Sequence, residues 1–329
     1  MPDQTFVSHA QNGEDVVLRR ALSDVPVGRY IDVGANHPAD DSVSRSFYDR
    51  GWRGLTVEPL AHLADLHREQ RPGDEVFQGV ISSSTDDHVV LHTYDDTGLS
   101  TTVDEVRDAH GATGRTATDV RVPSARLDDL LERLGWADEP IHFMSVDTEG
   151  AEADVLSTID LTRWRPWVLV VEATRPNSTV RSHESWEPGV LAGGYQFCLF
   201  DGLSRFYVAD EHADRLRELL DHGACVLDGY VTWHTVAAQE RITELDVARS
   251  RGVEDALRWR TAALTRWAES LVAAPGDDPE ELRRAFAEER AGMHAELALR
   301  RQEIAELRRT VSWRVTAPLR AVRRVRSDR

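Results

Sequence analysis

The stretch Tyr30-Ile-Asp-Val-Gly-Ala-Asn36 decides the fold. It reads as an apolar strand that runs into a turn of small residues, and Asp41-Ser42-Val43-Ser44 then offers two good caps for a helix. A ligand can approach the backbone at Gly34 closely because glycine has no side chain. Open parallel sheets bind their ligands outside the carboxyl ends of the strands. The sequence therefore predicts a crevice here, into which Asp32 and Asn36 point.

Short apolar runs alternate with amphipathic stretches from Gly28 to about Val208, the pattern of strands and crossover helices. The predicted strands span residues 29–33, 54–57, 75–81, 141–146 and 167–173, followed by an antiparallel hairpin of 195–200 with 204–208. A smaller hairpin, 88–94 with a partner near 118–122, brackets a long loop of the kind that often forms a lid. The predicted fold class is α/β, a doubly wound and mostly parallel sheet.

The amino-acid composition disfavours several classes of function. The 329 residues include 39 basic and 57 acidic side chains, a formal net charge of −18 that disfavours nucleic acid as a partner. All the basic residues are Arg, so no Lys is present to act as a base or to form a Schiff base. Cys198 and Cys225 read as two buried thiols. No leader pattern or long apolar run is present, which predicts a cytoplasmic location.

A carboxylate follows the second strand, in Gly54-Leu-Thr-Val-Glu58-Pro59. A carboxylate at this position can accept hydrogen bonds from both hydroxyl groups of an adenosine ribose. A dinucleotide site also needs Gly-x-Gly-x-x-Gly, but Asn36 and Ala39 replace the second and third glycines, so the diphosphate seat is missing. A nucleoside with a cationic sulfonium and an amino-acid tail suits the residues better. An NAD-linked oxidoreductase is the alternative enzyme that the missing glycines disfavour.

The chain resembles the FkbM family of S-adenosylmethionine-dependent methyltransferases over roughly residues 8 to 235. The resemblance rests on eight motifs in the same order: Ser8-His-Ala-Gln-Asn-Gly-Glu-Asp15, Asp32-Val-Gly-Ala-Asn36, Phe47-Tyr-Asp-Arg-Gly-Trp52, Val57-Glu-Pro59, Gly98-Leu-Ser-Thr101, Val146-Asp-Thr-Glu-Gly-Ala-Glu152, Val171-Glu-Ala-Thr-Arg-Pro176 and Asp201-Gly-Leu-Ser-Arg-Phe-Tyr207. It implies a Rossmann-like sheet of seven strands and methyl transfer to oxygen, often on sugars of natural products or surface glycans.

The resemblance also assigns cofactor-binding residues. Gly34 and Asn36 would line the methionine end of S-adenosyl-L-methionine, and Glu58 would bind its ribose. Gln11 and Glu14 would close over the site. Asp32 and Ser42 complete the predicted cofactor-binding set.

The predicted catalytic residues follow the buried strand 141–146. Asp147 falls at the strand tip above the cofactor's methyl group, and Glu149 lies one step further along the turn. A sugar hydroxyl needs a base, which typically contributes about 10²–10⁴-fold. Asp147 is the first choice for this base. It is alternatively a ligand, with Glu149 and Glu172, of a Mg²⁺ ion that activates the hydroxyl.

Three other side chains are candidates for the acceptor side. His37 and His183 lie in loops and offer rival bases, although a loop His is more often solvated or structural. Trp186 is a candidate surface for stacking a sugar ring, but burial in the core is the simpler reading.

The composition changes beyond Tyr230, which divides the chain into a methyltransferase domain (1–235), a helical extension (236–311) and a basic amphipathic tail (312–329). Two helices are predicted, about 235–272 and 280–311. They would form a coiled coil that joins copies of the chain, or a solvated helix folded on its own domain. The tail would contact an anionic membrane on its inner face, or fray. A degenerate methyltransferase body that serves as a scaffold is the third class of function.

Overall fold

The computed structural model describes residues 5–94, 100–112 and 116–272, and part of the segment from 280 to 302: residues 280, 283–284, 287–288, 290–292, 294–296, 298–299 and 301–302. The chain divides into two units, Met1–Trp233 and His234–Arg329. Gly98 and Leu99 of the predicted motif, the end of the second predicted helix and the predicted basic tail lie outside the described residues.

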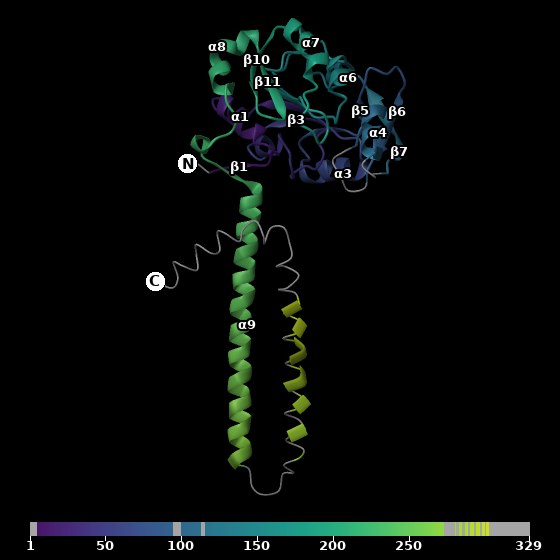
Figure 1. Ribbon diagram of the computed structural model, residues 1–329. Helices are drawn as coiled ribbons and strands as arrows, with labels where there is room; N and C mark the ends of the chain where they lie inside the picture. Colours follow the sequence, from purple (N-terminus) through teal and green to yellow (C-terminus); the bar gives the residue numbers. More distant parts are fainter. Residues whose placement is uncertain are drawn as a thin grey trace. The chain divides into compact units, whose positions relative to one another are not determined.

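A seven-stranded sheet forms the centre of the first unit (Figure 1). Its strand order is β10-β11-β9-β8-β2-β3-β4. Its strands are β2 (Arg29–Val33), β3 (Arg53–Val57), β4 (Glu75–Phe77), β8 (Phe143–Val146), β9 (Val168–Glu172), β10 (Tyr195–Phe200) and β11 (Ser204–Ala209). Neighbouring strands are parallel except in the two pairs that β11 makes. This confirms the predicted fold class and the antiparallel end of the sheet.

Hydrophobic clusters cover both faces of the sheet. Ile31 and Val33 of β2 belong to one cluster and Tyr30 to the other, because successive side chains of a strand point to opposite faces. The first cluster includes residues of α5 (Leu127–Arg133), α6 (Glu152–Leu156) and α7 (Glu187–Ala192); the second includes residues of α1 (Glu14–Ala21), α2 (Arg45–Tyr48) and α8 (Ala213–Leu216). Burial on both faces explains the nearly unbroken apolar runs of the central strands.

A second, three-stranded sheet has the order β5-β7-β6. It consists of β5 (Val80–Ile81), β6 (His88–Thr93) and β7 (Thr118–Ala125), and α4 (Asp104–Ala112) lies between β6 and β7 in the sequence. The predicted hairpin is therefore present, but the single strand predicted for 75–81 is wrong. It divides into β4 and β5 because the chain passes from one sheet to the other at Gly79, where a Cβ would lie 2.6 Å from the carbonyl oxygen of Pro123.

Two short strands from distant parts of the first unit pair with each other. β1 (Phe6–Ser8) is parallel to β12 (Tyr230–Thr232), with Phe6 opposite Tyr230. The remaining helices of this unit are α3 (Ala61–Gln70) and the 3₁₀ helices η1 (His183–Ser185), η2 (Asp210–His212), η3 (Arg217–Leu220) and η4 (Val226–Asp228). The β1–β12 pair ties the start of the described chain to the end of this unit.

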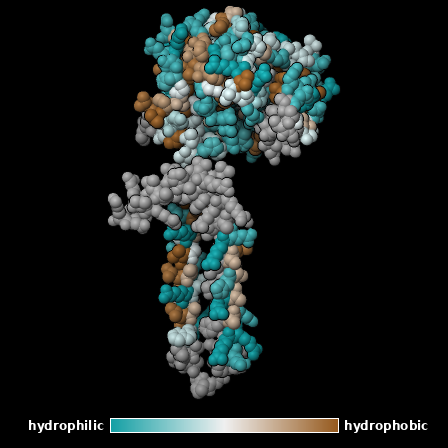
Figure 2. All heavy atoms as spheres, in the orientation of Figure 1, coloured by the Kyte–Doolittle hydropathy of each residue, from teal (hydrophilic) through white to brown (hydrophobic). Residues whose placement is uncertain are grey.

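A long helix, α9 (Trp233–Val272), continues into the second unit and matches the predicted helix 235–272. Figure 2 shows apolar residues among hydrophilic ones along this helix, and Val253, Leu257 and Leu264 are each more than half exposed. The described residues between 280 and 302 are helical. Within the described residues, no helix has the length and apolar character needed to cross a membrane.

Candidate active site

A cavity of about 850 Å³ opens at the carboxyl ends of β2, β3, β8 and β9. Its size lies within the range of about 300–1,000 Å³ that is common for small-molecule sites. β2 is the point where strand order reverses, because the next strand, β3, pairs on one side of it and β8 on the other. Such a switch point is where open α/β sheets bind ligands. The predicted crevice is therefore present.

The lining combines residues with predicted roles and residues for which the sequence predicted no role. Those with predicted roles are Gln11, Gly34, Asn36, Glu58, Asp147, Glu149 and Glu172. Hydroxyl and amide side chains not predicted for the site are Ser100, Thr102, Thr148, Thr174, Asn177, Ser178 and Thr179. The second group lies in loops, where local sequence gives no sign of which side chains converge.

Gly34 allows the tips of β2 and β8 to meet. Its φ is +84°, and a Cβ there would lie 1.7 Å from the carbonyl oxygen of Asp147. The Asp147 N–H donates a hydrogen bond to the Val33 carbonyl at 3.0 Å. Any side chain at position 34 would therefore push the two strand ends apart, so this glycine fixes the position of Asp147 beside the end of β2.

Backbone strain concentrates around the cavity. Among the described residues other than glycine, only Asn36, Asp41, Glu149 and Asn177 have positive φ, between 47° and 54°, and all four line the cavity. Left-handed backbone is uncommon for residues with a side chain, and it clusters at functional sites, where the surrounding structure enforces it. The strain thus marks the same place as the cavity.

Glu58 is held in a fixed orientation at the β3 tip. Its Oε2 accepts a hydrogen bond from the Asn36 N–H at 2.9 Å, and its Oε1 accepts one from the Leu60 N–H at 2.8 Å. Burial raises the pKa of Glu58 to about 7, and the two backbone donors oppose that rise. A carboxyl group therefore faces the cavity at the position predicted for ribose binding.

Three carboxyl groups meet at the tips of β8 and β9. Burial and the negative charge of Glu152 raise the pKa of Asp147, although its side chain is exposed to the open cavity. Burial and then Asp147 raise the pKa of Glu149 to about 8. The same two causes raise the pKa of Glu172 far above its usual range, and Asp147 and Glu172 share a hydrogen bond. Near neutral pH, Glu172 is therefore the protonated partner and Asp147 the ionised one.

Several buried polar atoms on this side of the cavity have no hydrogen-bond partner in the described structure. They are Glu149 Oε2, Glu172 Oε2, Thr174 Oγ1 and Ser100 Oγ. A buried polar atom without a partner costs about 1–3 kcal/mol, and native proteins keep few of them. All four residues line the cavity, which indicates a ligand that supplies the missing partners.

Three residues of the predicted cofactor-binding set do not line the cavity. The Asp32 carboxylate accepts a hydrogen bond from Ser44 Oγ, and Arg71 donates to Ser42 Oγ and Ser44 Oγ, each at 2.7 Å. Glu14 is buried and accepts the Asn12 N–H at 2.9 Å. Asp32 thus faces inward, against the expectation that it points into the crevice, because Ser44 and the positive charge of Arg71 offer its carboxylate partners within the protein.

Arg71 was missed by the sequence analysis. It is fully buried and also donates to the Pro38 carbonyl, so it holds the segment that connects Asn36 to Ser44. No local pattern marks an Arg at the end of a helix as buried, because most such residues are solvated. Its importance shows only when the loop after β2 folds back over it.

The predicted Mg²⁺ site is not supported. The described residues include no group of three or more His, Cys, Asp or Glu side chains that could hold a metal ion. Asp147, Glu149 and Glu172 interact with one another, and Asp147 and Glu172 share a hydrogen bond.

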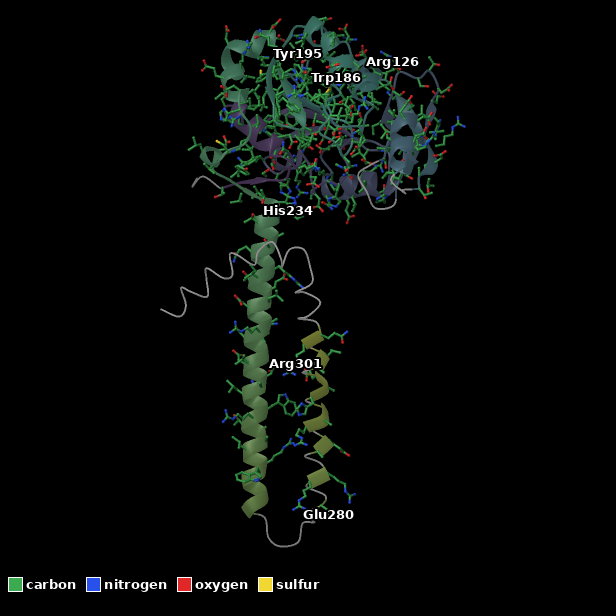
Figure 3. All side chains as sticks on the ribbon, viewed as in Figure 1. Arg126, Trp186, Tyr195, His234, Glu280 and Arg301 are labelled. Atoms are coloured by element: carbon green, nitrogen blue, oxygen red, sulfur yellow. The ribbon has the colours of Figure 1, made fainter. Side chains whose placement is uncertain are left out.

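The other acceptor candidates do not reach the cavity lining. His37 Nδ1 accepts the N–H groups of Ala39 and Asp40, at 3.2 and 2.9 Å, so it shapes its own loop. His183 lies beside Glu187 at 3.7 Å. Trp186 lies in the interior of the first unit, with 5% of its surface exposed (Figure 3). The simpler reading of Trp186 as a core residue is therefore the one the structure supports.

The fold and the cavity define a doubly wound α/β protein with a ligand site at its strand tips. The model of the family described as "Methyltransferase FkbM domain" matches residues 32–223, more than half of the chain. The chain belongs to the FkbM methyltransferase family, which confirms the resemblance and places the protein among methyltransferases rather than oxidoreductases. No curated protein matches the chain.

Three solved structures are similar to parts of this chain. A TehB-like SAM-dependent methyltransferase from Corynebacterium glutamicum is 10% identical, with a TM-score of 0.32, over 59% of this chain and 87% of its own. Fibrillarin from Aeropyrum pernix, with bound S-adenosyl-L-methionine, is 14% identical, with a TM-score of 0.31, over 63% and 85%. An O-methyltransferase from Bacillus cereus, in complex with SAH, is 12% identical, with a TM-score of 0.31, over 61% and 82%.

Proposed function

We propose that this protein transfers the methyl group of S-adenosyl-L-methionine to a hydroxyl of a carbohydrate or a glycosylated metabolite, in surface-glycan or natural-product biosynthesis. The observation that carries the proposal is that one cavity contains Glu58 at the β3 tip and Asp147 at the β8 tip. The first suits a nucleoside, and the second suits an acceptor that must lose a proton. The family membership supports methyl transfer.

The cavity fits the cofactor by its donor and acceptor groups. The Glu58 carboxylate would accept hydrogen bonds from the ribose hydroxyl groups. Gly34 and Asn36 would contact the methionine end of the cofactor, and Gln11 also lines the cavity. The acidic lining favours a cationic sulfonium. When bound, S-adenosylmethionine supplies an electrophilic methyl group.

Asp147 is the base in this proposal. Its raised pKa makes it a stronger base than an ordinary Asp, while it still ionises near neutral pH. Glu172 stays protonated and donates its proton to the shared hydrogen bond, which orients the Asp147 carboxylate. The remaining catalysis comes from holding the hydroxyl in line with the methyl group and excluding water.

The side chains that line the cavity beyond β9 suit an acceptor rich in hydroxyl groups. Thr174, Ser178 and Thr179 place hydroxyls, and Asn177 places an amide, along the part of the cavity beyond β9. Each of these groups both donates and accepts hydrogen bonds, as sugar hydroxyls do. A mostly aliphatic acceptor would leave the buried Thr174 hydroxyl without a hydrogen-bond partner.

Calorimetry with S-adenosylhomocysteine tests the proposed cofactor, and we expect heat of binding at one site per chain. Absence of heat from the wild-type protein would overturn the proposal. Incubation with methyl-labelled donor and a glycan extract, followed by mass spectrometry, locates the acceptor. We expect label on a sugar oxygen, and the yield to be unchanged by EDTA, because the base rather than a metal ion removes the proton.

A further inference from the structure

All the charged side chains among the described residues that line the cavity are acidic. They are Asp41, Glu58, Asp147, Glu149 and Glu172, and no Arg or His joins them. The acidic groups gather at the β8 and β9 tips, where burial and then the charges of Asp147, Glu152 and Glu149 raise the pKa of Glu172. A phosphate, sulfate or carboxylate on the acceptor would therefore meet repulsion and find no cationic partner on this wall.

The part of the cavity formed by Asp147, Glu149, Glu172 and Thr174, called the acidic wall here, also contains oxygen atoms that lack a hydrogen-bond donor. Glu172 is 6% exposed, and its Oε2 has no hydrogen-bond partner, although the residue lines the cavity. Thr174, two residues further along, is 1% exposed, and its Oγ1 is also unpaired. Glu149 adds a third unpaired oxygen from the neighbouring strand tip. These atoms are available to accept hydrogen bonds from a ligand.

We propose that the acceptor is an amino sugar with a free amine, and that Glu149 and Glu172 bind its ammonium group next to the hydroxyl that is methylated. This inference rests on the proposed function and names the substrate class of the same site. An ammonium group offers three N–H donors and no acceptor, which matches a wall of unpaired oxygens. S-adenosyl-L-methionine carries a sulfonium, an ammonium and a carboxylate, so its net charge is a single positive one, whereas Asp41, Glu58, Asp147, Glu149 and Glu172 all line the cavity.

Binding of an ammonium group should release protons. The carboxyl group of Glu149, with a pKa raised to about 8, is largely protonated at pH 7. A nearby positive charge favours the ionised carboxylate, so its proton passes to the buffer when the amine binds. An N-acetylated sugar is neutral and has no such effect. Proton release therefore separates recognition of an amine from recognition of a sugar ring.

The experiment compares matched probes on the full chain saturated with S-adenosylhomocysteine. Methyl glycosides of glucosamine, galactosamine and mannosamine are titrated against their N-acetylated partners at pH 7, in two buffers that differ in ionisation enthalpy. We expect at least one free amine to bind about tenfold tighter than its N-acetylated partner, equivalent to about 1.4 kcal/mol. We also expect its heat to depend on the buffer.

Two variants and a control assign the effect to the cavity wall. Glu149→Gln should remove most of the preference for the amine, because the amide cannot ionise, whereas Glu172→Gln, which keeps a neutral carbonyl oxygen in place of the protonated carboxyl group, should remove less of it. Glu184→Gln, an exposed change in η1 outside the cavity lining, should retain it. If a variant does not fold, as judged by circular dichroism, the comparison of amine and N-acetyl probes on the wild-type protein decides alone.

The outcomes of the two proposals are distinguishable. No heat with S-adenosylhomocysteine would overturn the proposed function. Normal binding of S-adenosylhomocysteine, with equal or weaker affinity for every free amine than for its N-acetylated partner, would overturn only the inference about the amine. Tighter binding of a phosphorylated or sulfated sugar would also overturn it.

Discussion

The carboxyl groups of Asp147 and Glu172 share a hydrogen bond across the ends of two neighbouring strands. The parallel register of β8 and β9 produces this contact, because Val146 pairs with Val171 and the next residue of each strand is an acid. Two acids at such a position cannot both ionise at low cost, so one retains its proton. The pair therefore contains an ionised base and a protonated partner that orients it.

Replacing the base should remove catalysis without removing the cofactor. We predict that Asp147→Asn lowers the rate of methyl transfer by about 10²–10⁴-fold, the usual contribution of a general base. Binding of S-adenosylhomocysteine should change little, because Glu58 and the β2 tip remain. Single-turnover transfer of labelled methyl and calorimetry measure the two quantities.

Asp138→Asn is a suitable control for this change, because Asp138 is exposed and does not line the cavity. It should retain both activity and binding. Full activity in Asp147→Asn would show that another group removes the proton.

Glu58 should control cofactor affinity and its dependence on pH. We predict that Glu58→Gln weakens binding of S-adenosylhomocysteine about tenfold, within the usual range for hydrogen bonds to a charged group. In the wild-type protein, the pKa of about 7 means that the accepting carboxylate is lost as the pH falls through 7. Affinity should therefore decrease from pH 8 to pH 6, and calorimetry at each pH measures it.

The variant should show a weaker pH dependence than the wild-type protein, because the amide does not titrate. Glu75→Gln, at an exposed position of β4, should behave as the wild-type protein does. An equal decrease in Glu58→Gln and in the wild-type protein would assign the pH effect to another group.

The sequence predicted the sheet and its switch point because the decisive signals are local. The run from Tyr30 to Val33 is apolar except for Asp32 and ends at glycine, and β8 and β9 are apolar except for Ser145 and for Glu172 at the end of β9. The tips of parallel strands meet at one edge whatever the loops do, so Glu58, Asp147 and Glu172 converge on one cavity.

The loops were harder to predict because their side chains have alternatives within the protein. Asp32 lies in β2, near the end of the strand where a ligand is expected. Its carboxylate nevertheless faces the protein interior, because Ser44 donates a hydrogen bond to it and the positive charge of Arg71 stabilises it. The hydroxyl and amide side chains that line the cavity come from separate loops, around Ser100, Thr148 and Thr174, and they share no spacing. The pairing of β1 with β12 joins strands of three residues, too short to show a periodic pattern.

Glu14 should make the ligand-free protein less stable as the pH rises. Burial raises its pKa from an ordinary 4.5 to about 8, so the folded protein keeps a proton that the unfolded chain loses above 4.5. Its contribution is fully present below pH 4.5 and is lost as the pH rises through about 8. The slope is about 1.4 kcal/mol per pH unit between these limits.

Urea unfolding between pH 6.5 and 8 measures this effect as the difference in slope between Glu14→Gln and the wild-type protein, because Glu58, Glu149 and Glu172, whose pKa values burial also raises, contribute equally to both. We predict that Glu14→Gln has a smaller slope and exceeds the wild-type stability at pH 8. Glu218→Gln, an exposed change, should keep the wild-type slope. Identical slopes in Glu14→Gln and the wild-type protein would contradict the assignment.

The C-terminal helices should serve association rather than catalysis. β12 ends at Thr232 and completes the pair with β1, and the first unit ends at Trp233, so a chain that stops at residue 235 retains every strand of that unit. We predict that this chain binds S-adenosylhomocysteine as the full chain does, but loses self-association in light scattering and binding to anionic vesicles. A chain that stops at residue 229 lacks β12 and should unfold at a lower temperature. Loss of cofactor binding in the chain of 235 residues would instead place α9 in the catalytic body.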